Sequence, residues 1–423
     1  MQSPPVRRMY YGWVVVGVVF TAIIMAAGLR ALPGPLMKPL EDEFGWDRAT
    51  ISIAVSLNLL LFGLLGPLVG RVTDRHGPKP VMLAGLVAGS VGVLGITVIQ
   101  TPWQLCLLWG VLGGMGAGAS TGVVVATVAS RWFTKRRGLV VGILSAAMSA
   151  GQLVFLPLVM AMIVFQGWRA AVGLVAGAVL VIALPLVAVF MKNDPKDAGQ
   201  TIEGGTPGTP GAMPVAVAVY PATQSPFRTF DFWLLASSYF VCGFTTLGLI
   251  GTHLIPHALD HGIPEVATAS LLGVMGFMNF VGTTAAGWLS DRFDKRKLLA
   301  VIYCLRGLSL VALPFLGDVT TLAIFAVVYG LDWIATVPPT VGLCADLYGR
   351  LRVGSVYGWV LLSHQVGAAA AAYLGGVSKV ALGDYGFAFM GAGILALLAV
   401  VMSLRVTRPV RQPDAVAPVS ASA

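Results

Sequence analysis

The chain has 423 residues, of which 57% are hydrophobic and only 11% are charged. A soluble protein of this composition would have too few polar side chains to cover its surface, so the composition favours a protein surrounded by lipid. The net charge of +9 does not indicate nucleic-acid binding, because the Lys and Arg residues are scattered through short segments rather than clustered on one amphipathic face.

Apolar stretches follow one another along the chain, each with about the 20 residues that a membrane-spanning helix needs. We predict twelve spans, near residues 11–32, 49–70, 80–99, 103–129, 138–163, 168–191, 231–256, 266–289, 298–316, 319–344, 353–377 and 384–405. The first stretch lacks the cleavage site of a signal peptide, so we expect it to remain as a helix. The four cysteines lie inside apolar stretches, and we interpret them as core residues rather than disulfides or metal ligands.

Basic residues are distributed unevenly between the two sides of these spans. Of the 27 Lys and Arg residues, Lys38, Arg48, Arg169 and Lys379 fall on one side, and Arg30 and Arg306 fall within spans. The other 21 lie on the side of both termini. The positive-inside rule therefore predicts a multi-pass protein of the cell (inner) membrane with both termini in the cytoplasm.

The segment 192–230 is the longest between spans and is rich in Pro, Gly, Thr and Ala, so we interpret it as a flexible cytoplasmic linker. It separates six-helix bundles at 1–191 and 231–408, and a tail follows at 409–423. Two matched loops support a duplication. Gly70-Arg-Val-Thr-Asp-Arg75 recurs 217 residues later as Gly287-Trp-Leu-Ser-Asp-Arg292, and 131–138 corresponds to 347–354. Such internal repeats are typical of transporters built from two related halves.

The motif Gly70-x-x-x-Asp-Arg-x-Gly-x-Lys-Pro80 resembles the signature between helices 2 and 3 of the major facilitator superfamily. The segments Tyr11-Gly-Trp13 and Phe44-Gly-Trp-Asp-Arg-Ala49 resemble bacterial relatives of the monocarboxylate transporters. The resemblance covers nearly the whole chain. It implies an all-α membrane protein with twelve transmembrane helices in two pseudo-symmetric six-helix bundles, which is the major facilitator fold.

The same resemblance implies a conformational gating role for Asp74 and Arg75 and for their second copies, Asp291 and Arg292. At the end of a span, a carboxylate can face a helix N-terminus and a guanidinium can bridge facing helices. In the family such contacts close the inner face and favour the outward-open state. The alternative is that these residues are solvated charges that only orient the chain.

Placing a charged side chain at the centre of a membrane helix costs at least roughly 2.5 to 3.5 kcal/mol on insertion scales, so we expect each such residue to have a structural or functional role. Arg30 lies late in the first predicted span and follows the small residues 26–28, which leave room for a ligand. We predict that Arg30 binds the carboxylate of a substrate; the alternative is an arginine that reaches the outer lipid headgroups. In the family a lysine of helix 1 contacts the substrate, and the position that aligns with it is Ala31, one residue later.

Arg306 and Asp332 lie at comparable depth in consecutive antiparallel spans, so we predict an ion pair between them. The pair is either structural or part of proton coupling, in which case Asp332 is protonated as the substrate binds. His364 is a further candidate for proton coupling, and His253 is a candidate for both the substrate cavity and proton transfer, because histidine titrates in the physiological range. Either histidine can instead be a hydrogen-bond donor between helices.

The monocarboxylate transporter pattern in helix 8 has an Asp or Asn four residues before the Arg that holds the carboxylate, and here the pair is Asn279 and Thr283. The cation is missing, so Arg30 would have to supply the charge that binds an anion. Further residues that we predict near the substrate, each with helix packing as the alternative, are Ser120, Thr121, Ser149, Gln152 and Trp333.

The chain has no Walker-type sequence, no His-Glu-x-x-His motif and no nucleophile elbow, so we expect neither an enzyme nor a cofactor. The predicted function is secondary active transport of a small organic anion, such as a monocarboxylate, in symport with protons and by alternating access. The alternative is a proton-driven exporter of drugs or metabolites on the same fold. Arg30 distinguishes the two, because exporters of cationic drugs usually need carboxylates in the cavity.

Overall fold

The computed structural model describes residues 10–46, 48–120, 122–203 and 218–408. Eleven helices in this part of the chain are long and apolar enough to cross a membrane, and a bent pair, Ile53–Leu64 with Gly66–His76, makes a twelfth span. Helices suit a lipid environment because each satisfies its own backbone hydrogen bonds. The predicted all-α, twelve-span architecture is confirmed.

The helices divide into two bundles. The N-terminal bundle consists of α1 (Tyr11–Ala31), α2 (Pro33–Phe44), α3 (Arg48–Leu64), α4 (Gly66–His76), α5 (Pro78–Gly95), α6 (Pro102–Leu105), the π-helix η2 (Cys106–Gly113), α7 (Gly114–Ala119), α8 (Gly122–Trp132), α9 (Arg137–Gln166), α10 (Trp168–Ala178), the π-helix η3 (Val179–Ala183) and α11 (Leu184–Phe190). The C-terminal bundle consists of α12 (Phe230–Gly243), the π-helix η6 (Phe244–Ile250), α13 (Gly251–Asp260), α14 (Glu265–Arg292), α15 (Lys295–Ala312), α16 (Val319–Asp332), α17 (Val337–Tyr348), α18 (Val353–Leu382) and α19 (Gly386–Arg405). Short 3-10 turns are η1 (Ile96–Val98), η4 (Pro195–Ala198), η5 (Pro226–Arg228), η7 (Leu313–Phe315) and η8 (Arg350–Arg352).

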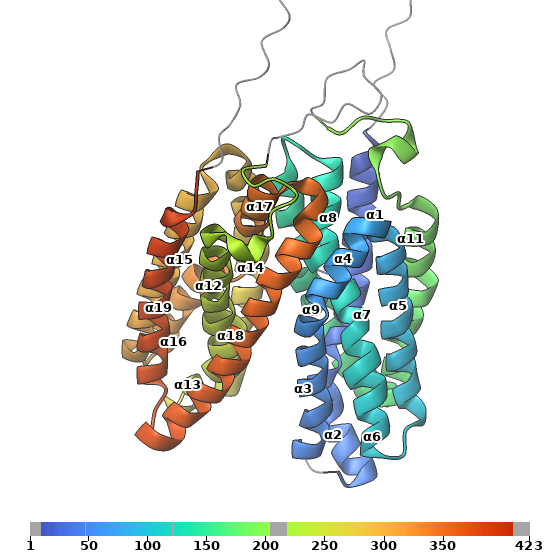
Figure 1. Ribbon diagram of the computed structural model, residues 1–423. Coiled ribbons are helices and arrows are strands. Elements are labelled where there is room, and N and C mark those ends of the chain that lie inside the picture. Colours follow the sequence, from blue (N-terminus) through green and yellow to red (C-terminus); the bar gives the residue numbers. More distant parts are fainter. Residues whose placement is uncertain (1–9, 47, 121, 204–217, 409–423) are drawn as a thin grey trace, which may run out of the picture.

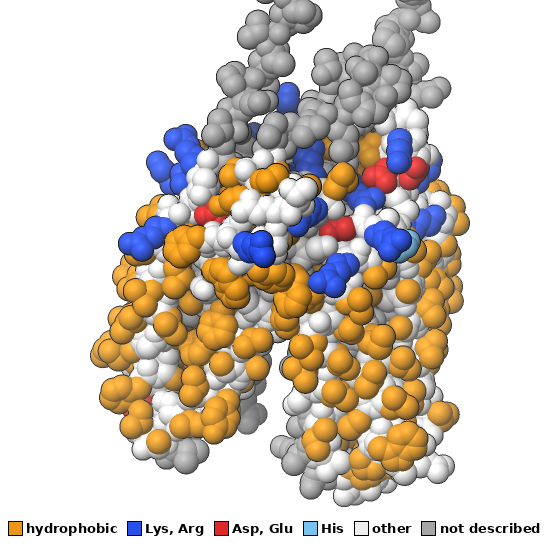
Figure 2. All heavy atoms as spheres, viewed as in Figure 1, with side chains coloured by type: hydrophobic (Ala, Val, Ile, Leu, Met, Phe, Trp, Pro, Cys, Tyr) orange, Lys and Arg blue, Asp and Glu red, His pale blue; other side chains and the backbone are white. Residues whose placement is uncertain are grey.

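The two bundles lie side by side (Figure 1). They meet near one end, where α4 ends and α9 and α18 begin, and they diverge toward the other end. Figure 2 shows most Lys and Arg side chains near the first end, and a hollow between the bundles that opens at the second. We call these ends the charged end and the open end. The molecule is therefore closed at its charged end and accessible between its halves from its open end.

The most extensive contacts between the bundles are those of α4 with α18 and of α9 with α14. Small residues at these contacts let the helix backbones approach closely. A Cβ atom added to Gly70 would lie 2.2 Å from the carbonyl oxygen of Gly354, and one added to Gly287 would lie 2.4 Å from that of Gly138. These glycines occupy matching positions in the two repeats. The duplication therefore extends to the packing between the halves.

Several of the described spans depart from the continuous helices that the sequence predicted. The helix that begins at Tyr11 is interrupted at Leu32 and continues as α2, and α3 and α4 meet at an angle of 46°. The tenth span is broken at residues 333–336, between α16 and α17. Prolines follow at the start of α17, and they cannot donate the backbone hydrogen bonds that would join the two helices.

The described parts of the segment 192–230 are fixed to the bundles. Glu203 forms a backbone bridge with Phe133 of the N-terminal half, and the backbone N–H of Tyr220 donates to the carbonyl oxygen of Leu347 over 2.9 Å. Each described end of the linker is therefore anchored to the bundle that it adjoins.

Candidate functional site

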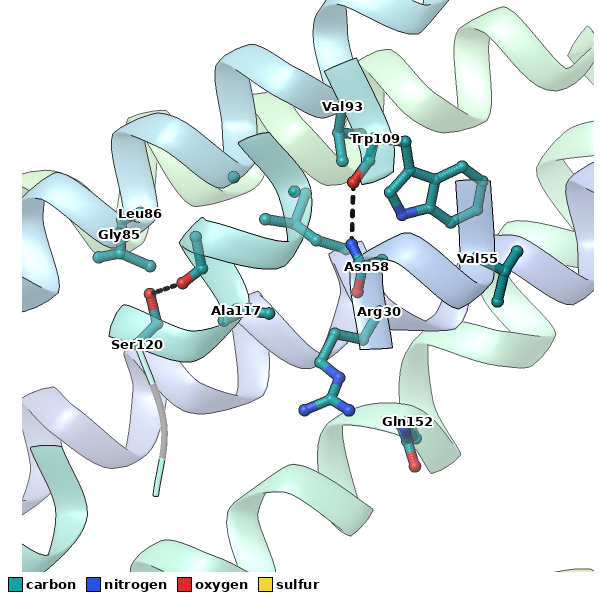
Figure 3. A pocket seen from close by; sticks show the side chains of 15 residues that line it. Arg30, Val55, Asn58, Gly85, Leu86, Val93, Trp109, Ala117, Ser120 and Gln152 are labelled. Atoms are coloured by element: carbon teal, nitrogen blue, oxygen red, sulfur yellow. Dashed lines mark hydrogen bonds between the residues drawn. The ribbon is translucent and has the colours of Figure 1, made fainter. Parts of the chain in front are cut away.

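A pocket of about 210 Å³ lies inside the N-terminal bundle, with walls from α1, α3, α5, η2, α7 and α9 (Figure 3). Its polar lining side chains are Arg30, Asn58, Ser120 and Gln152, and the remaining lining residues are Ala, Val, Leu, Trp and Gly. Among the described residues that line it, none is Asp or Glu. An apolar cavity with a few convergent polar groups is the usual form of a small-molecule site.

Arg30 brings a positive charge into this pocket. It is the penultimate residue of α1, its guanidinium carbon lies 4.5 Å from the centre of the Phe62 ring, and Figure 3 shows the side chain extending into the pocket. No carboxylate in the described part of the chain pairs with it. Arg30 is half-buried. A partly desolvated guanidinium without a counter-ion favours the binding of an anion, and its fork of donors matches a carboxylate.

Asn58 and Trp109 are pocket residues that were not predicted from the sequence. The Asn58 side-chain nitrogen donates to the carbonyl oxygen of Trp109 over 2.9 Å, which fixes the amide beside the pocket. Asn58 could have been recognised from the sequence, because a polar amide in the middle of an apolar span needs a partner. Nothing in the sequence distinguishes Trp109 from other aromatic residues of the spans. The predicted residue Ser120 donates to the carbonyl oxygen of Gly116 over 2.8 Å, and Thr121 lies outside the described residues.

The two predicted residues of α9 have different surroundings. Gln152 lines the pocket, whereas the Ser149 hydroxyl accepts a hydrogen bond of 2.6 Å from the Asn279 side-chain nitrogen on α14. The Asn279 side-chain oxygen in turn accepts from the Thr283 hydroxyl at 2.9 Å and from the backbone N–H of Ile334 at 3.1 Å. Asn279 therefore connects Ser149 of the N-terminal half with Thr283 and with the break in the tenth span, and none of these three side chains lines the pocket.

The predicted ion pair between Arg306 and Asp332 is confirmed. The Arg306 Nε donates to Asp332 Oδ1 over 2.8 Å, and the two side chains are 0% and 5% exposed. The terminal nitrogens of Arg306 contact the Sγ of Cys242 at 3.1 Å and the carbonyl oxygens of Asp332 and Trp333 at 2.6 and 2.9 Å. Every nitrogen of this guanidinium has a partner, so Arg306, unlike Arg30, has no donor left for a substrate.

The two oxygens of the Asp332 carboxylate differ. Oδ1 accepts from Arg306, whereas Oδ2 is buried and has no hydrogen-bond partner among the described residues. Asp332 also ends α16, where backbone carbonyls lose their helical donors, and Arg306 supplies donors to two of them. The pair therefore holds the two parts of the broken helix together. It also leaves one carboxylate oxygen of Asp332 buried without a hydrogen-bond partner, and protonation would remove the cost of burying this charge.

The other predicted residues of the C-terminal bundle lie apart from the pocket. His253 is buried with its Nε2 3.0 Å from the carbonyl oxygen of Ala372, and the Nδ1 of His364 lies 3.1 Å from the side-chain oxygen of Gln365. Trp333 contributes its carbonyl oxygen to the Arg306 cluster. Within the described residues, no group of three or more His, Cys, Asp or Glu side chains could hold a metal ion.

At the charged end, Asp74 and Asp291 make equivalent contacts across the two halves. Asp74 accepts from the backbone N–H groups of 354–355 at the start of α18, at 3.0 and 2.7 Å. Asp291 accepts from those of 138–139 at the start of α9, at 2.6 and 2.8 Å. The N-terminus of a helix has free N–H groups and a partial positive charge, so each carboxylate stabilises the closed arrangement of this end.

The arginines that join helices at the charged end are not the predicted ones, Arg75 and Arg292. Arg75 is exposed, and Arg292 stacks on an indole ring at 3.7 Å. The guanidinium that holds the end of α4 is instead that of Arg131, which donates to the carbonyl oxygens of 73–74 at 3.2 and 2.7 Å. Arg137 forms an ion pair of 2.5 Å with Asp346 across the halves, so the bridging arginines come from the second repeated loop.

The sequence of the chain matches a known protein family and several of its members. The sequence pattern of the Major Facilitator Superfamily matches residues 19–372 and 280–422. The chain is 28% identical over 386 residues to the uncharacterized MFS-type transporter YcxA of Bacillus subtilis, which covers 85% of this chain and 87% of that protein. It is 27% identical over 392 residues to monocarboxylate transporter 13 of Rattus norvegicus (92% and 87% covered) and 25% identical over 389 residues to the oxalate:formate antiporter of Oxalobacter formigenes (88% and 87%).

Solved structures share the fold at low sequence identity. The human organic anion transporter MFSD10 superposes with a TM-score of 0.72 at 16% identity, over 95% of this chain and 100% of that one. The proton:xylose symporter XylE superposes with a TM-score of 0.70 at 15% identity, over 94% and 96%. With the family pattern matched over most of its length, the chain belongs to the major facilitator superfamily and is a transporter related to the monocarboxylate transporters.

Proposed function

We propose that this transporter is a proton-coupled symporter of a small organic anion, a monocarboxylate. The observation that carries the proposal is the Arg30 guanidinium, which lines the N-terminal pocket without a carboxylate partner among the described residues. The alternative is a proton-driven exporter of drugs or metabolites. An exporter of cationic drugs usually needs acidic groups where the substrate binds, and the described lining has none. Gln152 and Asn58 are the polar groups available beside the anion.

We assign the proton to Asp332, with His364 as a second candidate. The buried Oδ2 of Asp332 has no partner in the described part of the chain. Protonation would neutralise the carboxylate and weaken its contact with Arg306. Because the same arginine holds the carbonyl oxygens at the break of the tenth span, loss of the ion pair would loosen that break and so connect protonation to a change of shape.

We propose that the charged end faces the cytoplasm, so that the arrangement closed by Asp74 and Asp291 is outward-open. The excess of Lys and Arg at that end supports this orientation through the positive-inside rule. Cysteines placed at Asp42, near the open end, and at Lys297, near the charged end, should react with an impermeant maleimide from opposite sides of the membrane. Labelling of both from one side would contradict the proposed topology.

Binding to the purified protein tests the role of Arg30. Arg30→Gln should lose specific binding of radiolabelled monocarboxylates, by at least about 100-fold in Kd, because the charged half of a buried carboxylate contact is removed. Arg169→Gln is the matched control, since Arg169 is exposed at the open end and paired with Glu43. Wild-type affinity in a folded Arg30→Gln protein would refute the assignment.

A further inference from the structure

We propose that the substrate is a monocarboxylate with one apolar tail about the size of an aromatic ring, and that Gly89 limits the size of this tail. The inference rests on the proposed function, because it takes Arg30 as the anchor of the carboxylate. It concerns what the rest of the pocket can hold.

The charges of the pocket limit the substrate to one carboxylate. Among the described lining residues, Arg30 is the one basic side chain. A second carboxylate would leave water without a counter-charge, and a buried unpaired charge is strongly unfavourable. The pocket therefore discriminates against dicarboxylates.

The rest of the lining suits an apolar tail. Leu29, Val55, Leu86, Val93 and Trp109 form much of the wall. The Ser120 hydroxyl already donates to a backbone carbonyl, and Asn58 uses one of its two amide hydrogens in the same way. The hydroxyl of a short hydroxy acid therefore finds few free partners in addition to those of the carboxylate. A short acid would also leave much of this apolar wall without contacts.

The volume of the pocket sets the size of the tail. An apolar cavity of about 150 Å³ in a protein interior binds benzene. The pocket here measures about 210 Å³, which leaves room for a carboxylate in addition to a ring. A monocarboxylate with a ring or a branched chain of similar volume therefore fits best.

Gly89 is the lining glycine at which a side chain can be added without disturbing the fold. A Cβ at Gly116 would lie 2.4 Å from the backbone nitrogen of Gly89, and one at Gly113 would lie 2.9 Å from the Trp109 ring. At Gly89 the nearest atoms would be the Leu29 Cδ1 at 3.3 Å and the Gly116 Cα at 3.7 Å. Since Leu29 also lines the pocket, a methyl group at position 89 occupies space beside it.

Competition binding to purified protein tests both parts of the proposal, with phenylacetate, propionate, malonate and the neutral phenylacetamide as probes. The wild type should bind phenylacetate more tightly than propionate, and malonate and phenylacetamide weakly. Gly89→Ala should weaken phenylacetate by about ten-fold and change propionate by less than about two-fold, because overpacking penalises only the ligand that fills the pocket. The control is Gly177→Ala, since a Cβ at Gly177 would meet nothing within 4 Å.

The outcomes separate this inference from the proposed function. Propionate or malonate binding more tightly than phenylacetate, with Arg30 still required, would overturn the ring-sized tail and leave the anion site standing. Equal weakening of phenylacetate and propionate in Gly89→Ala would overturn the size-limiting role of Gly89. If no carboxylate bound the folded wild type, the proposed function itself would fail.

Discussion

Replacing Arg306 with Met should destabilise the protein more than replacing Asp332 with Asn, although the two residues form one ion pair. Asp332→Asn leaves the guanidinium buried without its counter-ion but keeps the donor groups that face two backbone carbonyls, and breaking a buried pair in this way costs about 3 to 5 kcal/mol. Arg306→Met leaves a buried carboxylate and also removes the donors to those carbonyls. Each orphaned carbonyl adds about 1 to 3 kcal/mol.

The double variant should recover only part of the loss. Removing both charges abolishes the cost of an unpaired ion, but the carbonyl oxygens of Asp332 and Trp333 stay without their donors. We therefore expect the double variant to be about 2 to 6 kcal/mol less stable than the wild type and about 3 to 5 kcal/mol more stable than Arg306→Met alone.

Thermal unfolding in detergent, followed by circular dichroism, measures these differences. About 1 kcal/mol corresponds to roughly 2 to 4 °C in Tm for a unit of 150–250 residues, the size of each half. Arg405→Met, at an exposed position at the end of α19, is the control for loss of a basic residue. A double variant whose Tm falls by the sum of the two single changes would show that the side chains act independently.

Three further changes test other parts of the molecule. Arg30→Gln without substrate should raise Tm or leave it unchanged in a melting scan, because the cost of a charge without a counter-ion offsets its ring contact with Phe62; a fall of several degrees would mean that Arg30 is structural. Asp74→Asn or Asp291→Asn should increase the population open at the charged end, measured as longer distances between spin labels on α4 and α18, because the charge facing a helix N-terminus is lost; an unchanged distance distribution would remove these residues from gating. Burial raises the pKa of Glu203 above its ordinary value of 4.5, so the native state holds this proton more tightly than the unfolded state and loses stability as pH rises through that interval. Glu203→Gln should therefore be more stable than the wild type at pH 8 and should lose this advantage at pH 4, and melting curves with equal differences at both pH values would contradict the burial effect.

The spans and the Arg306–Asp332 pair could be predicted from the sequence, because the requirements of the lipid environment can be recognised in each segment by itself. A helix must be apolar over its whole length to cross a bilayer, whatever its neighbours. Two isolated charges of opposite sign at matching depth must also meet, because neither is tolerated alone. The interruption at Leu32 and the break at 333–336 were not predictable in this way, because hydropathy measures how apolar a segment is and not whether its backbone is continuous.

The sequence alone did not predict which polar residues belong to the same site, because this depends on how the two bundles pack. Ser149 and Gln152 lie within one turn of each other in the same apolar sequence, yet one bonds to the other half and the other lines the pocket. At the charged end, the carboxylate of Asp74 meets backbone N–H groups, which every helix start provides. The arginine partners are side chains whose positions follow from the fold, so the motif pointed to Arg75 while the structure uses Arg131.

Uptake of a labelled monocarboxylate into proteoliposomes with an acidic exterior tests proton-coupled anion transport most directly, after subtraction of diffusion into protein-free vesicles. The wild type should accumulate the anion above its external concentration and lose that ability when the pH gradient is removed, and Arg30→Gln should not take it up. The Arg306→Met, Asp332→Asn double variant should exchange labelled for unlabelled substrate but fail to accumulate it. Uptake by the wild type that is independent of the pH gradient, or full accumulation by either variant, would contradict the proposed mechanism.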